Sequence, residues 1–342
     1  MSYVVIVFLC AAIWLYLLLG GADFGAGIME LFTSGKNRRT ARQTMSHAIG
    51  PIWEANHMWL IIAVVILFVG FPRIYSVMSV SLHIPLLIML LGIIARGTAF
   101  VFRHYDAVKD QMQMVYNRIF VLSSAITPFF LGVIAASVLA GYVDPAAPNF
   151  LSAYVFSWLH WFAVGVGVFT VALCGYLASV YSIGEAENET DKRYFIRKTQ
   201  LMTVIAFAAG GCVFLAAKVE DIPLWQWVFG NVVGTGAVVL ATISLGAMAY
   251  AVSKEKTVLP RILAGFQVTM ILLAIGYRHF PDFVVLKNAP NLSLLKDQAP
   301  AATMNALGWA LLLGSVLILP ALFYLYYSFQ HEAKEHSEAA SA

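Results

Sequence analysis

Long apolar runs, separated by short polar stretches, dominate the pattern of this chain. Each run has about the 20 residues that a helix needs to cross the roughly 30 Å hydrocarbon core of a bilayer. The break between the second and third runs rests on Gly70 and Pro72, which interrupt helices. We expect nine membrane-spanning helices, near residues 3–31, 50–70, 74–101, 117–141, 153–183, 198–218, 224–251, 258–279 and 304–329.

The polar stretches between these runs are short. The longest cover residues 33–48, 184–197 and 280–303, and none has the composition of an interdomain linker. We therefore expect a single transmembrane domain over residues 1–342. The first run has neither a basic segment before it nor a small-residue cleavage site after it, so it is predicted to be a retained span and not a signal peptide.

Composition leads to the same class of protein. Apolar residues make up 61% of the chain and charged residues 11%, whereas soluble domains are about half apolar and a quarter charged. No stretch is basic and dense enough to predict binding to nucleic acid. The cysteines, Cys10, Cys174 and Cys212, lie far apart in apolar runs, which argues against a disulfide framework or a zinc site.

Lysine and arginine residues indicate the orientation in the membrane. They favour the loops after spans one, three, five and seven and the C-terminal tail by roughly three to one, with Arg103 counted in the loop after span three. The positive-inside rule then predicts an external N-terminus and a cytoplasmic C-terminus. Arg96 belongs to neither side because it lies within the third predicted span.

Three ionisable residues within predicted spans stand out: Asp23 in GGADFGAG, Glu54 in WEANH and Arg96 in GIIARGTAF. Each costs roughly 2.5–3.5 kcal/mol on membrane-insertion scales, so each is a candidate functional residue. The predicted orientation places all three in the cytoplasmic half, where they can converge. Two interpretations remain open, namely a path for protons and a carboxylate–arginine pair that fixes helix register.

Histidines offer a second kind of candidate. His57 follows Glu54 by one helical turn on the same face, so it is a candidate proton acceptor or haem ligand. His83 and His160 also lie within predicted spans. A histidine that forms hydrogen bonds between helices is the favoured interpretation, and no spacing predicts a metal site in this chain.

Several stretches carry the motifs of one known family. GADFGAGIMELF contains a D-F/M-G-x-G pattern, AIGPIWEANHMWLI an I-x-P-x-W-[DE]-x-N-x-x-W-L-I pattern, and LHIPLLIMLLGIIARGTAFVFRHY ends in R-G-x-x-F. GYRHFPDFV and LSLLKDQAPAATMNALGWALLLGSVLILPALFYLYYSF match a last loop and a ninth helix. In these motifs, from the first helix to the ninth, the chain resembles subunit II of cytochrome bd quinol oxidases.

The resemblance implies an all-α integral membrane protein whose nine helices form two four-helix bundles plus one peripheral helix. It implies a heterodimer in a bacterial or archaeal cytoplasmic membrane, with a homologous subunit I that carries the haems and the quinol loop. The expected cofactors there are haem b and, as a candidate, haem d. Such a complex oxidises quinol, reduces O2 to water and takes up cytoplasmic protons. Small single-helix accessory subunits are candidate partners, and a structural quinone or lipid is a candidate ligand of this chain.

The resemblance also carries over to particular residues. It assigns Asp23 and Glu54 to a proton path, although many relatives have aspartate where this chain has Glu54. Asn56 matches the motif asparagine and Arg96 the third-helix arginine. His57 stands where many relatives have glutamine or glutamate, so it is a candidate relay or a space-filling side chain.

The sequence therefore leaves three candidate functions for this chain. The first is an oxidase subunit that contributes carboxylates to proton uptake, and the second is a purely structural scaffold subunit of the same complex. The third is a stand-alone proton-coupled transporter, for which the internal repeats typical of that class are missing from the sequence.

Overall fold

The protein is almost entirely helical in a computed structural model, which describes residues 1–342 except 34–52, 106–111, 187, 255 and 342. The description also leaves out the side chains of residues 53–54, 104–105, 325–327 and 329–341. The helices are α1 (Ser2–Leu15), η1 (Tyr16–Gly20), α2 (Gly21–Leu31), α4 (Trp53–Gly70), α5 (Pro72–Ser81), α6 (His83–Tyr105), α7 (Met112–Leu139), α8 (Phe150–Tyr154), α9 (Trp161–Ser182), η2 (Ile183–Glu185), α10 (Glu189–Val219), α11 (Leu224–Phe229), α12 (Val232–Ser253), α13 (Val258–His279) and α14 (Ala301–Ser341). Two short strands, β1 (Asp282–Val284) and β2 (Leu292–Ser293), pair antiparallel between α13 and α14.

The count of membrane spans agrees with the prediction of a multi-span helical protein. Within the described residues, eight helices are long and apolar enough to cross a membrane, and α4 with α5 would make a ninth if that bent pair is one span. The predicted break at Gly70 is confirmed, and Pro72 begins α5, where a missing N–H removes no helical hydrogen bond. The predicted span 74–101 is wrong at its start, because α5 bends by 115° from α4 and a turn at Leu82 separates it from α6.

Two other predicted spans also begin later than expected. The runs 153–183 and 224–251 each start with a short separate helix, α8 or α11, before the long helix begins. In both cases a side chain caps the long helix: His160 Nδ1 accepts from Ala163 N at 3.3 Å, and Asn231 Oδ1 accepts from Gly234 N at 2.7 Å. Such caps satisfy N–H groups that the first turn of a helix leaves free.

The first predicted span is a single helix whose middle turn differs from the rest. Residues Ser2–Leu31 run continuously, but η1 between α1 and α2 is a π-helical turn. Turns of this kind are rare and occur often at functional sites. Because η1 directly precedes the segment that carries Asp23, it sets the position of that side chain.

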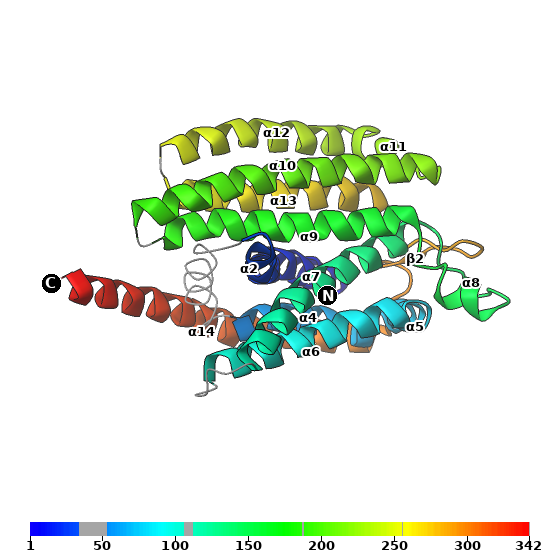
Figure 1. Ribbon diagram of the computed structural model, residues 1–342. Coiled ribbons are helices and arrows are strands. Elements are labelled where there is room, and N and C mark those ends of the chain that lie inside the picture. The colour runs from blue at the N-terminus through cyan, green and yellow to red at the C-terminus, as the bar shows by residue number, and fades with distance from the viewer. Residues whose placement is uncertain (34–52, 106–111, 187, 255, 342) are drawn as a thin grey trace.

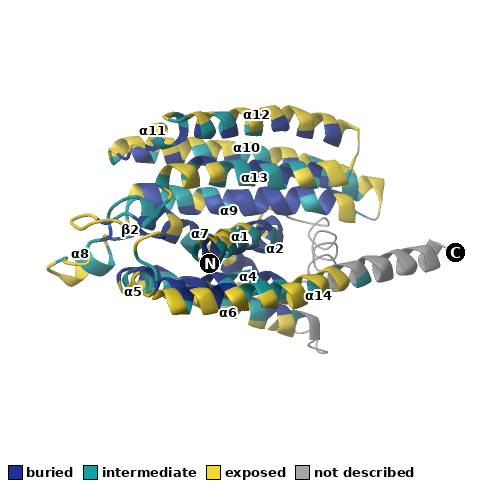
Figure 2. Cartoon of the chain, turned by 180° about the vertical axis from the view of Figure 1, so that it is seen from behind, coloured by how far each residue is buried: buried dark blue, intermediate teal, exposed yellow. Residues whose placement is uncertain are grey.

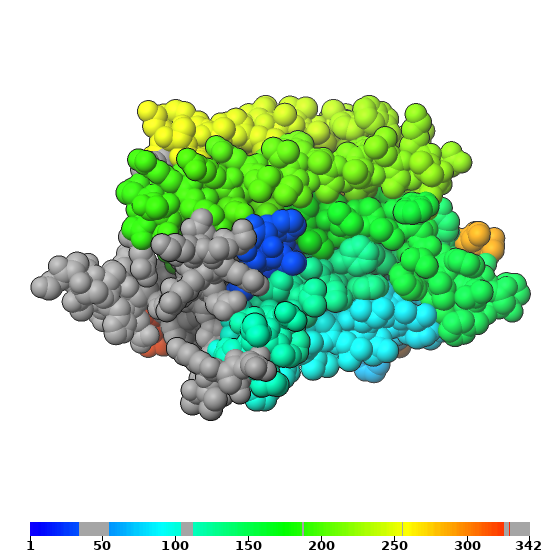
Figure 3. All heavy atoms as spheres, viewed as in Figure 1, coloured from blue at the N-terminus to red at the C-terminus, as the bar shows by residue number. Residues whose placement is uncertain are grey.

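The helices surround α2. In Figure 1, α9, α10, α12 and α13 lie side by side on one side of α2, and α4, α5 and α6 lie on the other. Within the described chain α2 packs against α7 and α9, and the burial colouring shows α9 as mostly buried while α6, α10 and α12 carry many exposed positions (Figure 2). On the face drawn in Figure 3, α2 is visible only as a small blue patch between larger green and blue-green surfaces. The two acids of α2, Asp23 and Glu30, are 1% and 2% exposed and therefore lie inside the protein.

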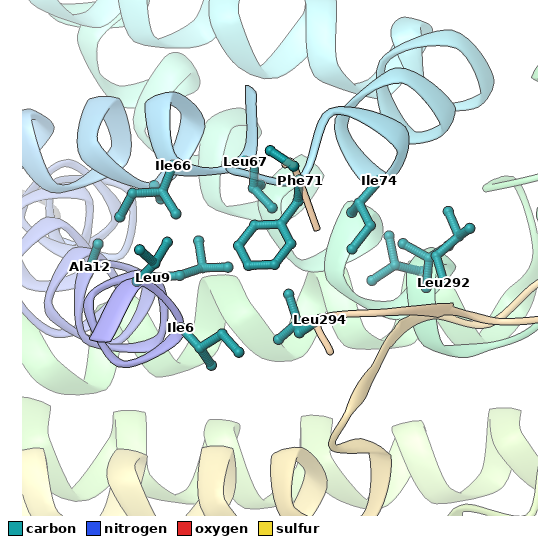
Figure 4. Packing of buried hydrophobic residues seen from close by; sticks show 14 of the residues in the cluster. Ile6, Leu9, Ala12, Ile66, Leu67, Phe71, Ile74, Leu292 and Leu294 are labelled. Carbon is teal, nitrogen blue, oxygen red and sulfur yellow. The ribbon is translucent and has the colours of Figure 1, made fainter. Parts of the chain in front are cut away.

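A large apolar cluster fixes the entry of the first span. Leu9 from α1, Ile66 from α4 and Phe71 from the α4–α5 break are fully buried in this cluster (Figure 4). Leu294, which follows β2, is a buried member of the same cluster. Contacts of this density leave little freedom for α1 to shift along its axis. The cluster thereby holds the register of the helix that continues into α2.

Candidate functional site

Asp23 and Arg96, which the sequence analysis placed at similar depth as residues that can converge, form a buried ion pair. Arg96 Nη1 donates to Asp23 Oδ2 at 2.7 Å, and Nη2 donates to Oδ1 and to the backbone carbonyl of Asp23, both at 2.8 Å. Arg96 Nε donates to Ser124 Oγ at 3.0 Å. Each of the two charged side chains is 1% exposed. The pair joins α2 to α6, and Ser124 adds α7.

The geometry explains how this part of the chain tolerates two enclosed charges. An ion pair in a low-dielectric interior is stable only if most of its remaining polar atoms also find partners. The guanidinium group here donates in a two-pronged arrangement to both carboxylate oxygens, which is the strongest arrangement for such a pair. It also lies 5.1 Å from the centroid of the Phe24 ring, a favourable position for a cation.

A second buried pair, Glu30 with Arg103, repeats the first about two helical turns further along α2 and α6. Arg103 Nη2 donates to Glu30 Oε1 at 2.7 Å, and both pairs join residues 73 apart in sequence. The Phe120 ring on α7 lies 4.9 Å from Arg96 Cζ and 4.7 Å from Arg103 Cζ, so it separates the two guanidinium groups. Two acids, two arginines and one ring thus form a continuous stack.

Glu30 was missed by the sequence analysis, and Arg103 was assigned to a loop. The structure corrects that assignment, because Arg103 lies within α6 and its side chain is 6% exposed. One signal in the sequence was available: an acid and an arginine follow Asp23 and Arg96 at the same spacing. The polar residues nearby made Arg103 resemble an ordinary residue at the end of a span.

Glycines bring α2 close to its neighbours. A Cβ atom on Gly25 would collide with the backbone carbonyl of Cys174 in α9, and one on Gly27 would collide with the Ser124 side chain in α7. Only small residues allow helices in a membrane protein to approach this closely. The close packing on α7 places Ser124 within reach of Arg96.

The WEANH motif lies at the start of α4, and only part of it is described. The backbone of Glu54 is in the first turn of α4, but its side chain lies outside the described residues, so its convergence with Asp23 stays a prediction. Asn56 is 2% exposed, and its Oδ1 has no hydrogen-bond partner among the described residues. The His57 ring lies 5.8 Å from the Phe24 ring and 6.2 Å from the Tyr16 ring. His57 therefore faces the segment that carries Asp23.

The other two histidines of interest lie at helix ends. His83 is the first residue of α6, and its Nδ1 contacts the Val80 carbonyl at 2.8 Å. His160 precedes the membrane span that starts at Trp161, so its predicted place inside a span is wrong. Its Nδ1 lies 3.2 Å from Glu220 Oε2, which links the start of α9 to the end of α10.

The His160–Glu220 contact predicts a pH dependence of stability. Burial lowers the pKa of His160 from its ordinary value of 6.5 and outweighs the opposite effect of Glu220. The unfolded chain then binds more protons than the folded chain at pH values just below 6.5, so stability decreases as the pH falls through that value. Replacing His160 with asparagine supplies a side-chain oxygen that can cap the helix in place of Nδ1, but it removes the titration. As the pH falls from about 7 to about 5, the melting temperature of this variant should rise relative to that of the wild type. A difference between the two melting temperatures that stays constant over this range would contradict the prediction.

An open groove of about 840 Å³ runs along α1 and α13. It is lined mainly by apolar side chains, with Asn231 and Arg278 among the few polar ones. Trp14 Nε1 donates to Thr269 Oγ1 at 2.8 Å across it. Its size suits the chain of a lipid or a quinone.

Comparison with known proteins identifies the family. A family model described as cytochrome bd terminal oxidase subunit II matches residues 1–329. The chain is 30% identical over 203 residues to cytochrome bd ubiquinol oxidase subunit 2 of Bacillus subtilis (strain 168), a match that spans 57% of this chain and 58% of that relative. It is 22% identical over 351 residues to cytochrome bd-I ubiquinol oxidase subunit 2 of Escherichia coli (strain K12), covering 93% of this chain and 91% of that one.

The fold is also found in a solved complex. A chain in the structure of bd oxidase from Geobacillus thermodenitrificans superimposes with a TM-score of 0.74 at 18% identity, over 96% of this chain and 98% of that one. At this identity the likeness shows the fold, and the family model that covers nearly the whole sequence shows the kinship. The chain therefore belongs to the cytochrome bd terminal oxidase subunit II family, the transmembrane subunits of a bacterial respiratory oxidoreductase complex.

Proposed function

We propose that this chain is subunit II of a terminal oxidase that oxidises quinol and reduces O2 to water. It pairs with a haem-bearing subunit I and contributes Asp23 and Glu54 to a path for protons from the cytoplasm. The observation that carries the proposal is the enclosed Asp23–Arg96 pair, which lies on two motifs typical of this family. Small accessory subunits remain candidate partners.

The proposed topology follows the distribution of positive charges. The N-terminus faces outward, the tail after α14 faces the cytoplasm, and residues 1–342 form one domain. The spans form two four-helix bundles with α14 as the peripheral helix. In this orientation the Glu30–Arg103 pair lies nearer the cytoplasm than the Asp23–Arg96 pair, and α4 begins on the cytoplasmic side.

The proposed proton path uses the chemistry of the paired carboxylate. Asp23 accepts two side-chain hydrogen bonds from Arg96, while a carboxylate has about four acceptor positions, so positions remain for water. Protonation of Asp23 would leave the Arg96 charge without its counter-ion in a low-dielectric interior, which favours onward transfer. Glu54 collects protons at the start of α4, and Asn56 and His57 support water between the two acids.

Haem b and the candidate haem d are assigned to subunit I, where they supply electron transfer and oxygen chemistry. Among the described residues no group of three metal-binding side chains is assembled. In this chain, the groove along α1 and α13 is the candidate site for a structural lipid or quinone.

The test is quinol-driven oxygen consumption by the purified complex, recorded together with its haem spectrum. We expect Glu54→Gln and Asp23→Asn to retain the haems and to slow turnover on the order of 10²-fold, the usual cost of losing a proton-transfer group. Glu185→Gln is the matched control, because Glu185 is a partly exposed acid paired with Arg261. Normal turnover of both test variants would refute the proton role.

A scaffold function without proton transfer is the second candidate. The observation that favours it is the two-pronged Asp23–Arg96 pair, because it joins α2 to α6 with both carboxylate oxygens engaged. A scaffold role predicts that Asp23→Asn releases the haem-bearing partner during purification. The proton role predicts an intact but slow complex, so the haem spectrum separates the two.

A further inference from the structure

Tyr16 carries an enclosed hydroxyl group for which the fold gives no structural reason. The residue is 3% exposed, and its Oη has no hydrogen-bond partner among the described residues. Tyr176 in α9 is buried to a similar degree, but its hydroxyl donates to Gln267 Oε1 at 2.5 Å. An enclosed polar group without a partner destabilises a protein, so phenylalanine would suit position 16 better if only packing mattered.

The Tyr16 ring leans along the helix toward Asp23. Its Cε2 and Cδ2 atoms lie 3.1 and 3.2 Å from the position that a Cβ on Gly20 would occupy, and its centroid lies 6.3 Å from that of Phe24. Helical side chains normally point back toward the N-terminus. Gly20, four residues further on, has no side chain and leaves room for the Tyr16 ring on that side. The ring therefore extends toward the ion pair.

The Tyr16 side chain is packed among apolar residues, including Phe24 and Ile28, next to residues of the proposed proton path. Asp23, Arg96 and Cys174 lie close enough to act electrostatically on the Tyr16 hydroxyl. The His57 ring lies 6.2 Å from the Tyr16 ring. Because this chain alone already encloses Tyr16 Oη, a partner subunit has no direct access to it. Internal water, which is small and both donates and accepts hydrogen bonds, is the partner that the proposal below requires.

We propose that Tyr16 is a proton-relay residue, which extends the path from the Asp23–Arg96 pair further into the membrane. This inference rests on the proposed function of the chain. The Tyr16 oxygen accepts a proton from a water on the Asp23 side while its own proton leaves to a water on the far side. One O–H bond forms as another breaks, so Tyr16 is neutral before and after, and no electron is transferred.

The test is Tyr16→Phe in the purified complex, which keeps the ring and removes only the hydroxyl. We expect intact haems, an unchanged or higher melting temperature and turnover that is slower by about tenfold. The ratio of wild-type turnover to Tyr16→Phe turnover should be larger in D2O than in H2O. Gly20→Ala is a second variant that keeps the hydroxyl but pushes the ring away from Asp23, and it should also slow turnover.

Tyr176→Phe is the matched control, because it makes the same chemical change at an equally buried site with a real hydrogen bond. It should lower the melting temperature and leave turnover unchanged. Normal turnover of Tyr16→Phe together with slow turnover of Asp23→Asn would overturn the relay and leave the proposed function standing. Normal turnover of both would overturn both. A fall in stability of Tyr16→Phe like that of Tyr176→Phe would also overturn the relay, because it would reveal a structural partner.

Discussion

Replacing Arg96 with glutamine should lower the free energy of unfolding by about 3–5 kcal/mol, the usual cost of removing one partner of a buried ion pair. The loss arises because the Asp23 carboxylate stays enclosed, at 1% exposure, without its cation. A glutamine side chain donates fewer hydrogen bonds and carries no charge to replace it. Thermal and denaturant unfolding of the purified complex would measure the change.

Two further variants separate the buried charge from a general effect of losing an arginine. Arg73 forms an ion pair with Asp297 at 2.8 Å, but its side chain is 66% exposed, so Arg73→Gln should cost only about 0–1 kcal/mol. Combining Arg96→Gln with Asp23→Asn removes both charges and should recover most of the lost stability. Equal losses for Arg96→Gln and Arg73→Gln would mean that the enclosed pair contributes no more than a surface contact.

The pairing of Asp23 with Arg96 could be predicted from the sequence because of what each residue costs. A single charge in an apolar run is so unfavourable that a partner of opposite sign is expected, and only a few candidates exist in this chain. The same reasoning failed for Glu30 and Arg103. They lie near the ends of their spans, where exposed charges are common, and only the structure shows that their side chains are enclosed, at 2% and 6% exposure.

The helix ends were less predictable than the helices themselves. Hydropathy does not distinguish a span from a short helix that precedes it, so α8 and α11 were merged with the longer helices that follow. The side chains that separate them, His160 and Asn231, act through single hydrogen bonds to the first turn of the next helix. A polar residue inside a long apolar run is the signal that marks such a cap.

Tyr16 lay outside what the sequence could reveal. It stands in an apolar run with no ionisable neighbour in sequence, and neither hydropathy nor spacing indicates a π-helical turn at residues 16–20. Its relation to Asp23 depends on a side-chain direction that only the packing of Gly20 and Phe24 sets. The sequence thus predicted Asp23 and Arg96 as site residues and not the neutral hydroxyl of Tyr16.

The stacked pairs also suggest why α2 needs such close neighbours. The Asp23–Arg96 and Glu30–Arg103 pairs both span from α2 to α6, and Phe120 of α7 lies between the guanidinium groups. A shift of α2 by a fraction of an ångström changes all of these contacts together. The glycines that set its distance from α7 and α9 are therefore part of the site, although none of them carries a functional group.

Replacing Gly25 with alanine should lower the free energy of unfolding by about 3 kcal/mol, at the upper end of the range for overpacking. The new Cβ would collide with the Cys174 carbonyl and the Ala178 side chain in α9, and a backbone carbonyl in a helix cannot rotate away. α2 must then move, which also displaces Asp23 from Arg96. Gly211→Ala is the matched control, because a Cβ there meets no atom within 4 Å, and alanine in a helix is favoured over glycine by roughly 0.5–1 kcal/mol. Melting temperatures of the two purified complexes, with their haem spectra, compare the sites directly. If Gly25→Ala melted like Gly211→Ala, the α2–α9 contact would be too compliant to hold the ion pair in place.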